Sequence, residues 1–285
     1  MSCKKESLFQ VAKTQLFKFL ASFLSSRRSF FISELAREIV RSYDNNCNED
    51  IGKNGESLLL NTILANRESG LFIDVGANKG DWSAKVLTKN FRGRLFAVDP
   101  LLSNIEKLKK RFEGVAGFYP LQYALSDSIK DADFFSNANG ENSGTDSLHN
   151  MTGIGYTADL NVVKVKCTTL ESIANEFKID KIDFLKIDTE GNEFFVLKGA
   201  QQLLSKGSID FIQIEFGHAW RAARVYLHDV VGLINKYEYD IYIIKPNGFL
   251  PLRFTPFIEN RYSYINLLIM RRQVSHLLKD QILSR

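Results

Sequence analysis

From residue 71 onward, short apolar segments alternate with segments of helical periodicity, and this alternation constrains the fold more than any other feature. Successive strand–helix–strand units make right-handed crossovers and build a parallel sheet with helices on both faces. The last two predicted strands have no long helix between them, so we expect an antiparallel pair. The predicted fold is α/β: a doubly wound, mostly parallel sheet with an antiparallel C-terminal strand pair, preceded by an N-terminal helical extension. Strands are predicted over Leu71–Val75, Arg94–Val98, Phe118–Ala124, Val162–Cys167, Asp183–Ile187, Ile209–Phe216, Asp240–Lys245 and Tyr264–Met270, and helices over 80–90, 101–112, 170–177, 192–204 and 222–236.

The segment before residue 56 has a different pattern. Residues 6–24 and 29–43 carry apolar positions three and four apart, which predicts two amphipathic helices. We expect the first helix to pack on the main domain or on a second subunit, which leaves a homo-oligomer open. The alternative is a helix on a membrane surface, and therefore a peripheral membrane contact. Polar, turn-rich residues 44–55 are the predicted boundary, and a third helix is expected over 56–67. In the second helix we expect burial of Phe30, Ile32, Leu35, Ile39 and Val40.

Composition excludes several classes of protein. Hydrophobic residues make up 45% of the 285 residues, which is enough for a full core and too many for a disordered chain. The formal net charge is +4 without a run of five basic residues, so nucleic acid is not an expected partner. Lys13 and Lys18 interrupt the first apolar stretch, which argues against a secretory signal. Three cysteines far apart in the sequence indicate reduced thiols in a cytoplasmic protein: Cys3, Cys47 and Cys167.

The turn after the first predicted strand is rich in glycine. Gly76 and Gly80 let the backbone approach a ligand closely, and the N–H groups that begin the next helix face an anion. The spacing is Gly-x-x-x-Gly with Asp74 in front, which departs from the G-x-G-x-x-G pattern of nicotinamide enzymes. The turn also lacks the Gly-Lys-Ser/Thr of a phosphate-binding P-loop. It therefore predicts a cofactor site of another kind.

Two aspartates follow the next predicted strands. Asp99 ends the second strand, 23 residues after Gly76, where an acidic residue can bind both ribose hydroxyls of a nucleoside cofactor. The alternative is that Asp99 caps the helix that starts near Leu101. Asp127 follows the third strand and could accept a hydrogen bond from an adenine amino group, or it could be an ordinary turn residue.

Acidic residues gather at the predicted carboxyl edge of the sheet, where ligands of open α/β sheets bind. Asp188 and Glu190 end a very apolar strand, and Glu193 lies in the next helix. These carboxylates suit proton removal or cation binding, although helix capping and dipole pairing are the structural alternatives. Glu215 and His218 are predicted at the same edge.

The order and spacing of these segments resemble the FkbM family of methyltransferases. The resemblance covers about residues 56–218, and its most specific element is the Lys-Ile-Asp-x-Glu-Gly-x-Glu block. It implies a class I methyltransferase (Rossmann-like) fold and S-adenosylmethionine as the donor. It also implies O-methylation of a sugar, a glycolipid or a secondary metabolite. The matching segments are Asp74–Gly80, Asp99-Pro100, Ala124–Asp127, Leu185–Glu193 and Val196–Ala200.

The resemblance also assigns roles by position. Asp99 would hold the ribose, although the family usually has Glu there, and Asp127 would lie near the adenine. The acceptor would face Asp188 and Glu190. The implied domains are an extension over 1–55, a methyltransferase domain over 56–272 and a tail over 273–285. The methionine end of the cofactor would be held by Asp74, Gly76, Asn78 and Gly80.

A sugar hydroxyl needs a base before it can accept a methyl group. Asp188 is the first candidate and His218 the second. Alternatively, a divalent cation such as Mg²⁺, held by Asp188 and Glu190, could lower the pKa of the hydroxyl. The sequence does not decide between a base and a metal, so we assign no residue as a metal ligand. The expected partner is a small-molecule or glycan acceptor, and segments 136–158 and 246–263 are expected to line its site.

Two other functions remain open at this stage. One is a nucleotide-sugar or nicotinamide enzyme built on the same sheet. The other is a binding or scaffold protein that has kept the fold and lost the activity.

Overall fold

The computed structural model describes residues 2–24, 30–88, 91–137, 146–152, 160–255 and 264–284, with the side chains of 2–10 and 23–24 left out. The chain forms two compact units, residues 1–46 and 47–285, and each is described by itself. Their boundary falls within the predicted turn-rich stretch 44–55. The predicted division into three domains stays a prediction.

The first unit contains two helices, α1 (Ser2–Leu24) and α2 (Phe30–Asp44), as predicted. The predicted burial of the apolar residues of α2 is wrong. Phe30, Ile32, Leu35, Ile39 and Val40 are all exposed, because two helices alone offer no third layer to cover an apolar stripe. Among the described residues, no helix combines the length and the apolar character needed to cross a membrane.

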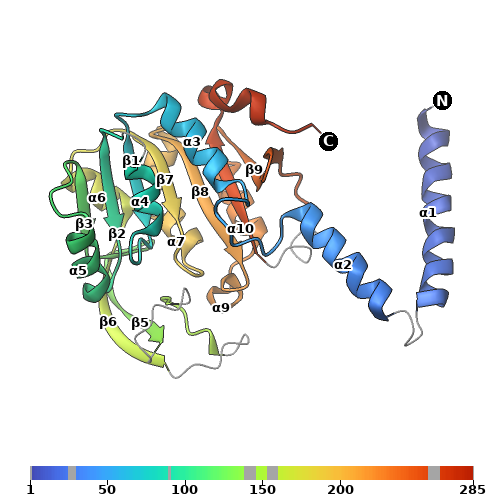
Figure 1. The fold of residues 1–285 in the computed structure, drawn as a ribbon, viewed down its shortest axis with the longest axis horizontal. Coiled ribbons are helices and arrows are strands. Elements are labelled where there is room, and N and C mark those ends of the chain that lie inside the picture. Colours follow the sequence, from blue (N-terminus) through green and yellow to red (C-terminus); the bar gives the residue numbers. More distant parts are fainter. Residues whose placement is uncertain are drawn as a thin grey trace. The chain divides into compact units, whose positions relative to one another are not determined.

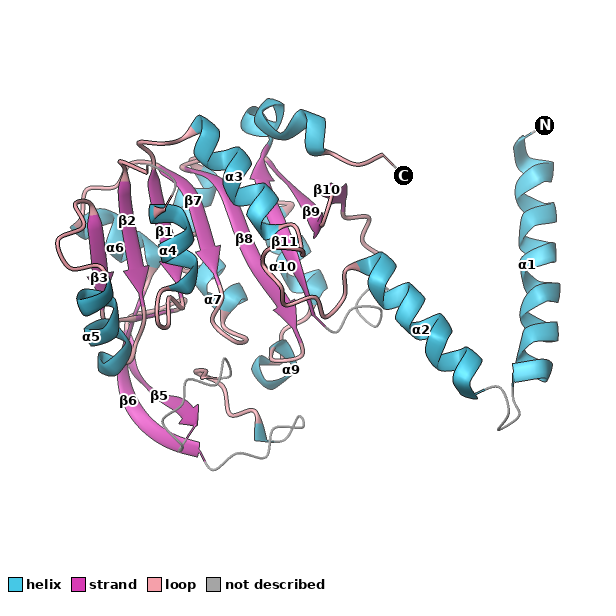
Figure 2. Ribbon diagram, viewed as in Figure 1, coloured by secondary structure: helices cyan, strands magenta, loops and turns pink. Residues whose placement is uncertain are grey.

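The second unit is built on an eight-stranded sheet with the order β10-β9-β11-β8-β7-β1-β2-β3. The neighbouring strands β8, β7, β1, β2 and β3 are parallel to one another. Strand β11 is antiparallel to both β8 and β9 (Figure 2). The predicted doubly wound sheet with an antiparallel C-terminal pair is thereby confirmed. The strands are β1 (Leu71–Val75), β2 (Arg94–Val98), β3 (Phe118–Leu121), β7 (Ile182–Ile187), β8 (Ile209–Gly217), β9 (Tyr239–Lys245), β10 (Gly248–Pro251) and β11 (Tyr264–Arg271).

Helices cover both faces of this sheet (Figure 1). Successive residues of a strand point to opposite faces, so neighbours in the sequence enter different cores. Phe72 packs in the core under α3, α4 and the 3-10 helix η4, whereas Ile73 packs in the core under α6, α7, α8 and α10. The helices of this unit are α3 (Glu56–Asn66), α4 (Asp81–Leu87), α5 (Leu102–Arg111), α6 (Leu170–Glu176), α7 (Glu193–Lys198), α8 (Gln201–Ser205), α9 (Trp220–Ala223), α10 (Leu227–Ile234) and η4 (Arg272–Gln281).

Several elements differ from the prediction. The predicted strand over 118–124 ends as β3 at Leu121, and β4 (Ala124–Leu125) joins a separate sheet with β5 (Lys130–Asn137) and β6 (Leu160–Thr168). The predicted helix over 192–204 is two helices. A Cβ on Gly199 would lie 2.2 Å from the carbonyl oxygen of Ser126, so the break marks a close approach of two backbone segments.

The topology brings the candidate residues together. The carboxyl ends of β1, β2, β7 and β8 lie at one edge of the sheet, and β1 is the strand at which the order reverses. Ligands of doubly wound folds bind in the crevice at this reversal. Tyr264, the first residue of the antiparallel β11, pairs with Gly217 and so reaches the same edge.

Candidate active site

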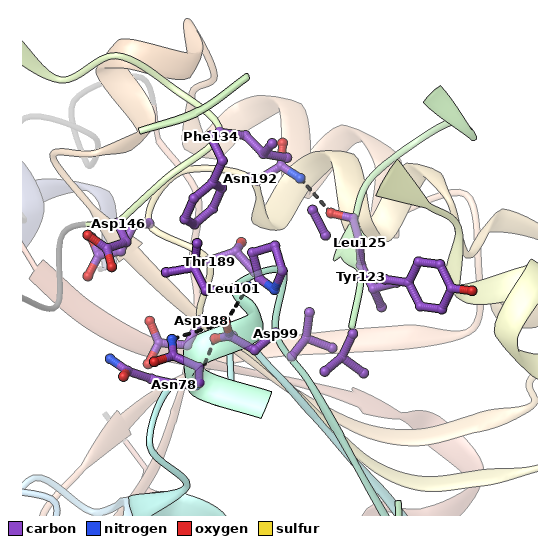
Figure 3. A pocket seen from close by; sticks show the side chains of 18 residues that line it. Asn78, Asp99, Leu101, Tyr123, Leu125, Phe134, Asp146, Asp188, Thr189 and Asn192 are labelled. Carbon is purple, nitrogen blue, oxygen red and sulfur yellow. Dashed lines mark hydrogen bonds between the residues drawn. The ribbon is translucent and has the colours of Figure 1, made fainter. Parts of the chain in front are cut away.

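A cavity lies over the carboxyl ends of β1, β2 and β7, and we name it the first cavity (Figure 3). One part of its wall is apolar, from Leu101, Leu125 and Phe134, and the other part is polar. The polar side chains are Asn78, Asp99, Asn104, Asp146, Asp188, Thr189, Glu190 and Asn192.

Asp99 is buried at the end of β2 and accepts three hydrogen bonds. Its Oδ1 accepts from the backbone N–H of Leu101 at 3.0 Å and from the side chain of Asn104 at 3.0 Å. Its Oδ2 accepts from the backbone N–H of Asn78 at 2.9 Å. Burial raises the pKa of Asp99 to about 6 despite these donors. A carboxylate has about four acceptor positions, two on each oxygen. Both positions of Oδ1 and one of Oδ2 are used, so Oδ2 can still accept from one hydroxyl but not from two.

The glycine loop folds tightly against β7. A Cβ on Gly76, whose φ is +78°, would lie 1.7 Å from the carbonyl oxygen of Asp188. Asn78 is also left-handed, with φ of +49°, and this turn aims its N–H at Asp99. Gly80 has a different role, because a Cβ there would meet Leu108 at 2.6 Å. Gly80 therefore lets α4 pack on α5.

A second cavity lies beside the first, between the glycine loop, the segment before α3 and the start of β11. Asp74 lies on its floor, is fully buried and accepts a hydrogen bond from the Ser83 hydroxyl at 2.7 Å. The second cavity is lined by Glu49, Ile51, Glu56, Asp74, Gly76, Ala77, Asn78, Lys79, Asp81, Trp82, Lys186, Asp188, Glu215, Tyr264 and Asn266.

Lys186 is the buried cation of the second cavity. Its Nζ lies 2.8 Å from Asp188 Oδ2 and 3.9 Å from Asp74 Oδ1. Burial alone would lower the pKa of Lys186, but Asp188 and Asp74 raise it above its ordinary value. Lys186 therefore stays cationic and is paired with Asp188. No role was predicted for this residue, although a lysine inside a buried strand signals a charged partner.

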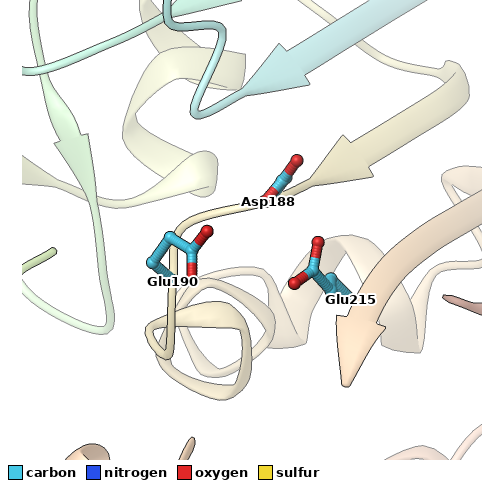
Figure 4. Close-up of side chains that lie close together, drawn as sticks. All are labelled: Asp188, Glu190 and Glu215. Atoms are coloured by element: carbon cyan, nitrogen blue, oxygen red, sulfur yellow. The ribbon is translucent and has the colours of Figure 1, made fainter. Parts of the chain in front are cut away.

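The carboxyl oxygens of Asp188, Glu190 and Glu215 lie within 4.8 Å of one another, a spacing that could hold a metal ion (Figure 4). Asp188 and Glu190 belong to the turn after β7, and Glu215 belongs to the neighbouring β8. Burial, then the charge of Asp188, raises the pKa of Glu190 to about 9 and that of Glu215 well above its ordinary value. Glu190 therefore keeps its proton at neutral pH, and burial shifts the pKa of Glu215 in the same direction.

The protonation of Glu190 makes stability depend on pH. Between pH 4.5 and about 9, the unfolded state loses the Glu190 proton while the folded state keeps it. The free energy of unfolding of the cofactor-free protein therefore falls as pH rises through this window. We expect Glu190→Gln to remove this contribution, so that its stability relative to the wild type increases from pH 5 to pH 9. Urea unfolding at several pH values measures the difference, and a difference independent of pH would contradict it.

Glu193 has a structural role. It is buried and accepts hydrogen bonds from the Thr189 N–H at 2.7 Å, the Thr189 hydroxyl at 2.9 Å and the Gly191 N–H at 3.0 Å. These bonds hold the turn in which Glu190, with φ of +53°, is left-handed. Such a conformation is strained for a residue other than glycine. Glu193 thereby fixes the backbone that carries Asp188 and Glu190.

Glu56 holds the wall of the second cavity. Its carboxylate is buried and accepts hydrogen bonds from the side chains of Asn54 at 2.6 Å, Gln213 at 2.5 Å and Asn266 at 3.1 Å. This network ties the segment before α3 to β8 and β11. The sequence offered no motif for Glu56, because two of its three partners, Gln213 and Asn266, lie more than 150 positions away in the chain.

Other predicted residues lie outside both cavities. Asp127 is paired with Lys198 at 3.0 Å, and its predicted place near the adenine stays a prediction. His218, just after β8, is not among the described residues that line either cavity.

The two predicted acceptor segments are described in part. Residues 146–152 contribute Asp146 and Leu148 to the first cavity, and residues 246–255 line neither cavity. The parts 138–145, 153–159 and 256–263 lie outside the described residues.

The comparisons with known proteins agree with this geometry. The model of the FkbM methyltransferase domain matches residues 74–241, which is more than half of the chain. The chain belongs to the FkbM methyltransferase family. It is therefore a methyltransferase with the class I, Rossmann-like fold that the sequence predicted.

Two kinds of relative accompany the family match. The hexuronic acid methyltransferase AglP of Haloferax volcanii is 27% identical over 195 residues, which cover 68% of this chain and 73% of AglP. The structure of an FkbM methyltransferase from Methylobacillus flagellatus has a TM-score of 0.45 and 17% identity. It covers 71% of this chain, which spans 44% of that protein. SMU.1697c from Streptococcus mutans, crystallised with SAH, has a TM-score of 0.41 and 7% identity, covering 76% of this chain and 98% of that one.

Proposed function

We propose that this FkbM methyltransferase transfers a methyl group from S-adenosylmethionine to a hydroxyl of a sugar or sugar-containing small molecule. One observation supports this proposal above the others: the two cavities meet. Gly76, Asn78 and Asp188 line both of them, so a cofactor in the first cavity and an acceptor in the second would touch at these residues. The sugar class is taken from the name of the relative AglP.

The residues of the first cavity fit a nucleoside cofactor. Asp99 Oδ2 has an acceptor position left for one ribose hydroxyl, and Leu101, Leu125 and Phe134 form an apolar wall for a base. The backbone of Gly76 carries no side chain that would keep a ligand away. Asn78 lines both cavities and Asp74 lines the second, which suits the amino-acid end of a cofactor that reaches the border between them.

In this proposal Asp188 takes the proton of the acceptor hydroxyl. When bound, S-adenosylmethionine would supply a methyl group made electrophilic by its sulfonium. Asp188 faces both cavities, and its side chain is about one-third exposed, so an acceptor can reach it. Lys186 holds one of its oxygens, which orients the carboxylate and leaves the other oxygen for the hydroxyl. Glu190, which keeps its proton at neutral pH, would donate a hydrogen bond beside it.

Calorimetric titration with S-adenosylmethionine and with NAD tests the cofactor. We expect binding of S-adenosylmethionine alone, weakened about 10- to 100-fold by Asp99→Asn, because a hydrogen bond to a charged group is lost. Asp240→Asn, which removes an exposed pair with Arg272 outside both cavities, should bind within about threefold of the wild type. Binding of NAD instead would favour the nicotinamide enzyme. Binding of neither ligand would favour the inactive binding protein.

A divalent cation at the three carboxylates is the second candidate for the chemistry. The negative charge of the cluster is already reduced, because Lys186 is paired with Asp188 and Glu190 keeps its proton at neutral pH. We therefore expect methyl transfer to continue unchanged after dialysis against a chelator. Loss of activity with EDTA and recovery with Mg²⁺ would show that a metal lowers the pKa of the hydroxyl instead.

A further inference from the structure

The N-terminal unit carries the whole net charge of the protein. Residues 1–46 contain eight basic residues (lysine or arginine) and four acidic residues. Residues 47–285 contain 29 basic and 29 acidic residues. The formal net charge of +4 therefore lies in the two helices and their connection, and the second unit is neutral overall. Such a separation of charge indicates an anionic partner for the first unit.

The same unit carries most of the exposed apolar surface. Twelve of the nineteen large apolar side chains that are exposed in the described part of the chain belong to α1 and α2. Isolated exposed apolar residues are ordinary, but a concentration in two helices marks an interaction site. The twelve are Val11, Leu16, Phe17, Phe19, Leu20, Phe30, Phe31, Ile32, Leu35, Ile39, Val40 and Tyr43.

The apolar residues of α2 form one continuous face. Phe31, Leu35 and Ile39 are spaced by four residues and are 75%, 51% and 61% exposed. Two ion pairs lie beside this face, Arg37 with Glu34 and Arg41 with Glu38. These arginines pair within the helix, and the other six basic residues of the unit belong to α1 and to the sequence that follows it.

The positive charge of α1 has little compensation within the helix. It contains four lysines and one acidic residue, Glu6, and Arg27 and Arg28 follow it. Lys13 and Lys18 alternate along α1 with exposed apolar side chains such as Leu16 and Phe17. A helix that spans hydrocarbon would bury these lysines, which is costly, whereas a helix in the interface keeps them at the headgroups.

We propose that residues 1–46 bind the surface of a membrane that contains anionic lipids. The helices lie in the plane of the interface, with the apolar face of α2 and Leu16 and Phe19 of α1 in the acyl boundary and Lys13 and Lys18 at the phosphates. A second copy of the chain is a poorer partner, because pairing two α1 helices would bring like charges together. A lipid surface offers both the opposite charge and the apolar layer.

Sedimentation of the full chain with vesicles tests this proposal. We expect binding to phosphatidylcholine mixed with phosphatidylglycerol, at least about tenfold weaker binding to phosphatidylcholine alone, and release by salt. Each basic residue near an anionic surface contributes roughly fivefold, so Lys13→Glu/Lys18→Glu should weaken binding by about 25-fold or more. Phe31→Ser/Ile39→Ser should weaken binding to both kinds of vesicle.

Matched variants in the second unit serve as controls. Lys109→Glu/Lys110→Glu reverses two exposed lysines of α5, and Ile129→Ser removes an apolar side chain that is 72% exposed. Both controls should bind vesicles like the wild type, and the melting temperature should show that every variant folds. Loss of binding in the controls as large as in the α1 variant would mean a general charge effect and would overturn the proposal.

Three further outcomes would also overturn it. The wild type could bind neither kind of vesicle, or bind both equally. It could instead sediment as a dimer that Phe31→Ser/Ile39→Ser dissociates, in which case the apolar face of α2 joins two copies. A methyltransferase that binds vesicles but not S-adenosylmethionine would keep this inference and lose the proposed function, so the two are tested separately.

Discussion

We expect Gly76→Ala to lose about 3 kcal/mol or more of stability and to lose cofactor binding altogether. The residue has φ of +78°, which costs a side chain about 1–2 kcal/mol, and its Cβ would lie 1.7 Å from the carbonyl oxygen of Asp188. A change of rotamer cannot relieve this overlap, because the backbone fixes the position of the Cβ and the oxygen is itself a backbone atom. The glycine loop and the turn after β7 would have to separate at the point where the two cavities meet. Thermal unfolding measures the first effect and calorimetry the second.

Gly114→Ala is the matched control for this variant. Gly114 also has a left-handed φ, +74°, but no atom lies within 4 Å of the place for its Cβ. We expect a cost of about 1 kcal/mol, or roughly 2–4 °C in melting temperature for a unit of this size, with unchanged cofactor binding. If both variants lost the same stability, the left-handed backbone alone would explain the effect, and the contact with Asp188 would not be tight.

The sheet was predictable because its signals are local. Leu71–Val75 and Arg94–Val98 were predicted to the residue, since each is a short apolar run ended by a polar turn. The strand β5 was missed because its apolar residues, such as Phe134, alternate with charged ones in a stretch that also contains turn residues. The break at Gly199 was missed because the close approach of Ser126 is a contact between segments far apart in the chain.

The residues of the site were predictable where they belong to a sequence motif. Gly76, Asn78, Asp99, Asp188 and Glu190 were predicted and lie around one cavity. The role of Asp99 was predicted less well, because its hydrogen bonds with Asn78, Leu101 and Asn104 leave room for one hydroxyl and not two.

The electrostatics of the site could not be predicted from the sequence. The pKa of Glu190 depends on its burial and on the nearby charge of Asp188, and both follow from packing in three dimensions. The pairing of Lys186 with Asp188 follows from packing too.

We expect Asp188→Asn to reduce the rate of methyl transfer by about 10²–10⁴-fold while S-adenosylmethionine still binds. The amide has the size of the carboxylate but cannot take the proton of the acceptor hydroxyl, and general base catalysis contributes a factor of this order. Steady-state kinetics with an acceptor, together with calorimetry, separates the two properties. His218→Asn is the comparison, because His218 was the second candidate for the base. We expect it to keep the rate within about threefold, since the described residues that line the cavities do not include it.

Asp188 also holds the buried cation Lys186, so a structural effect must be told apart from a catalytic one. Asp133→Asn removes an aspartate–lysine pair of similar length, 2.7 Å to Lys164, from the exposed part of β5. It should change neither the rate nor the melting temperature appreciably. A catalytic Asp188 predicts a fall in kcat that persists at temperatures where the variant is fully folded, and a recovery toward high pH, where the hydroxyl ionises without help. A variant with full turnover would remove Asp188 from the role of base, and a fall that followed only the loss of folded protein would leave it as a partner of Lys186.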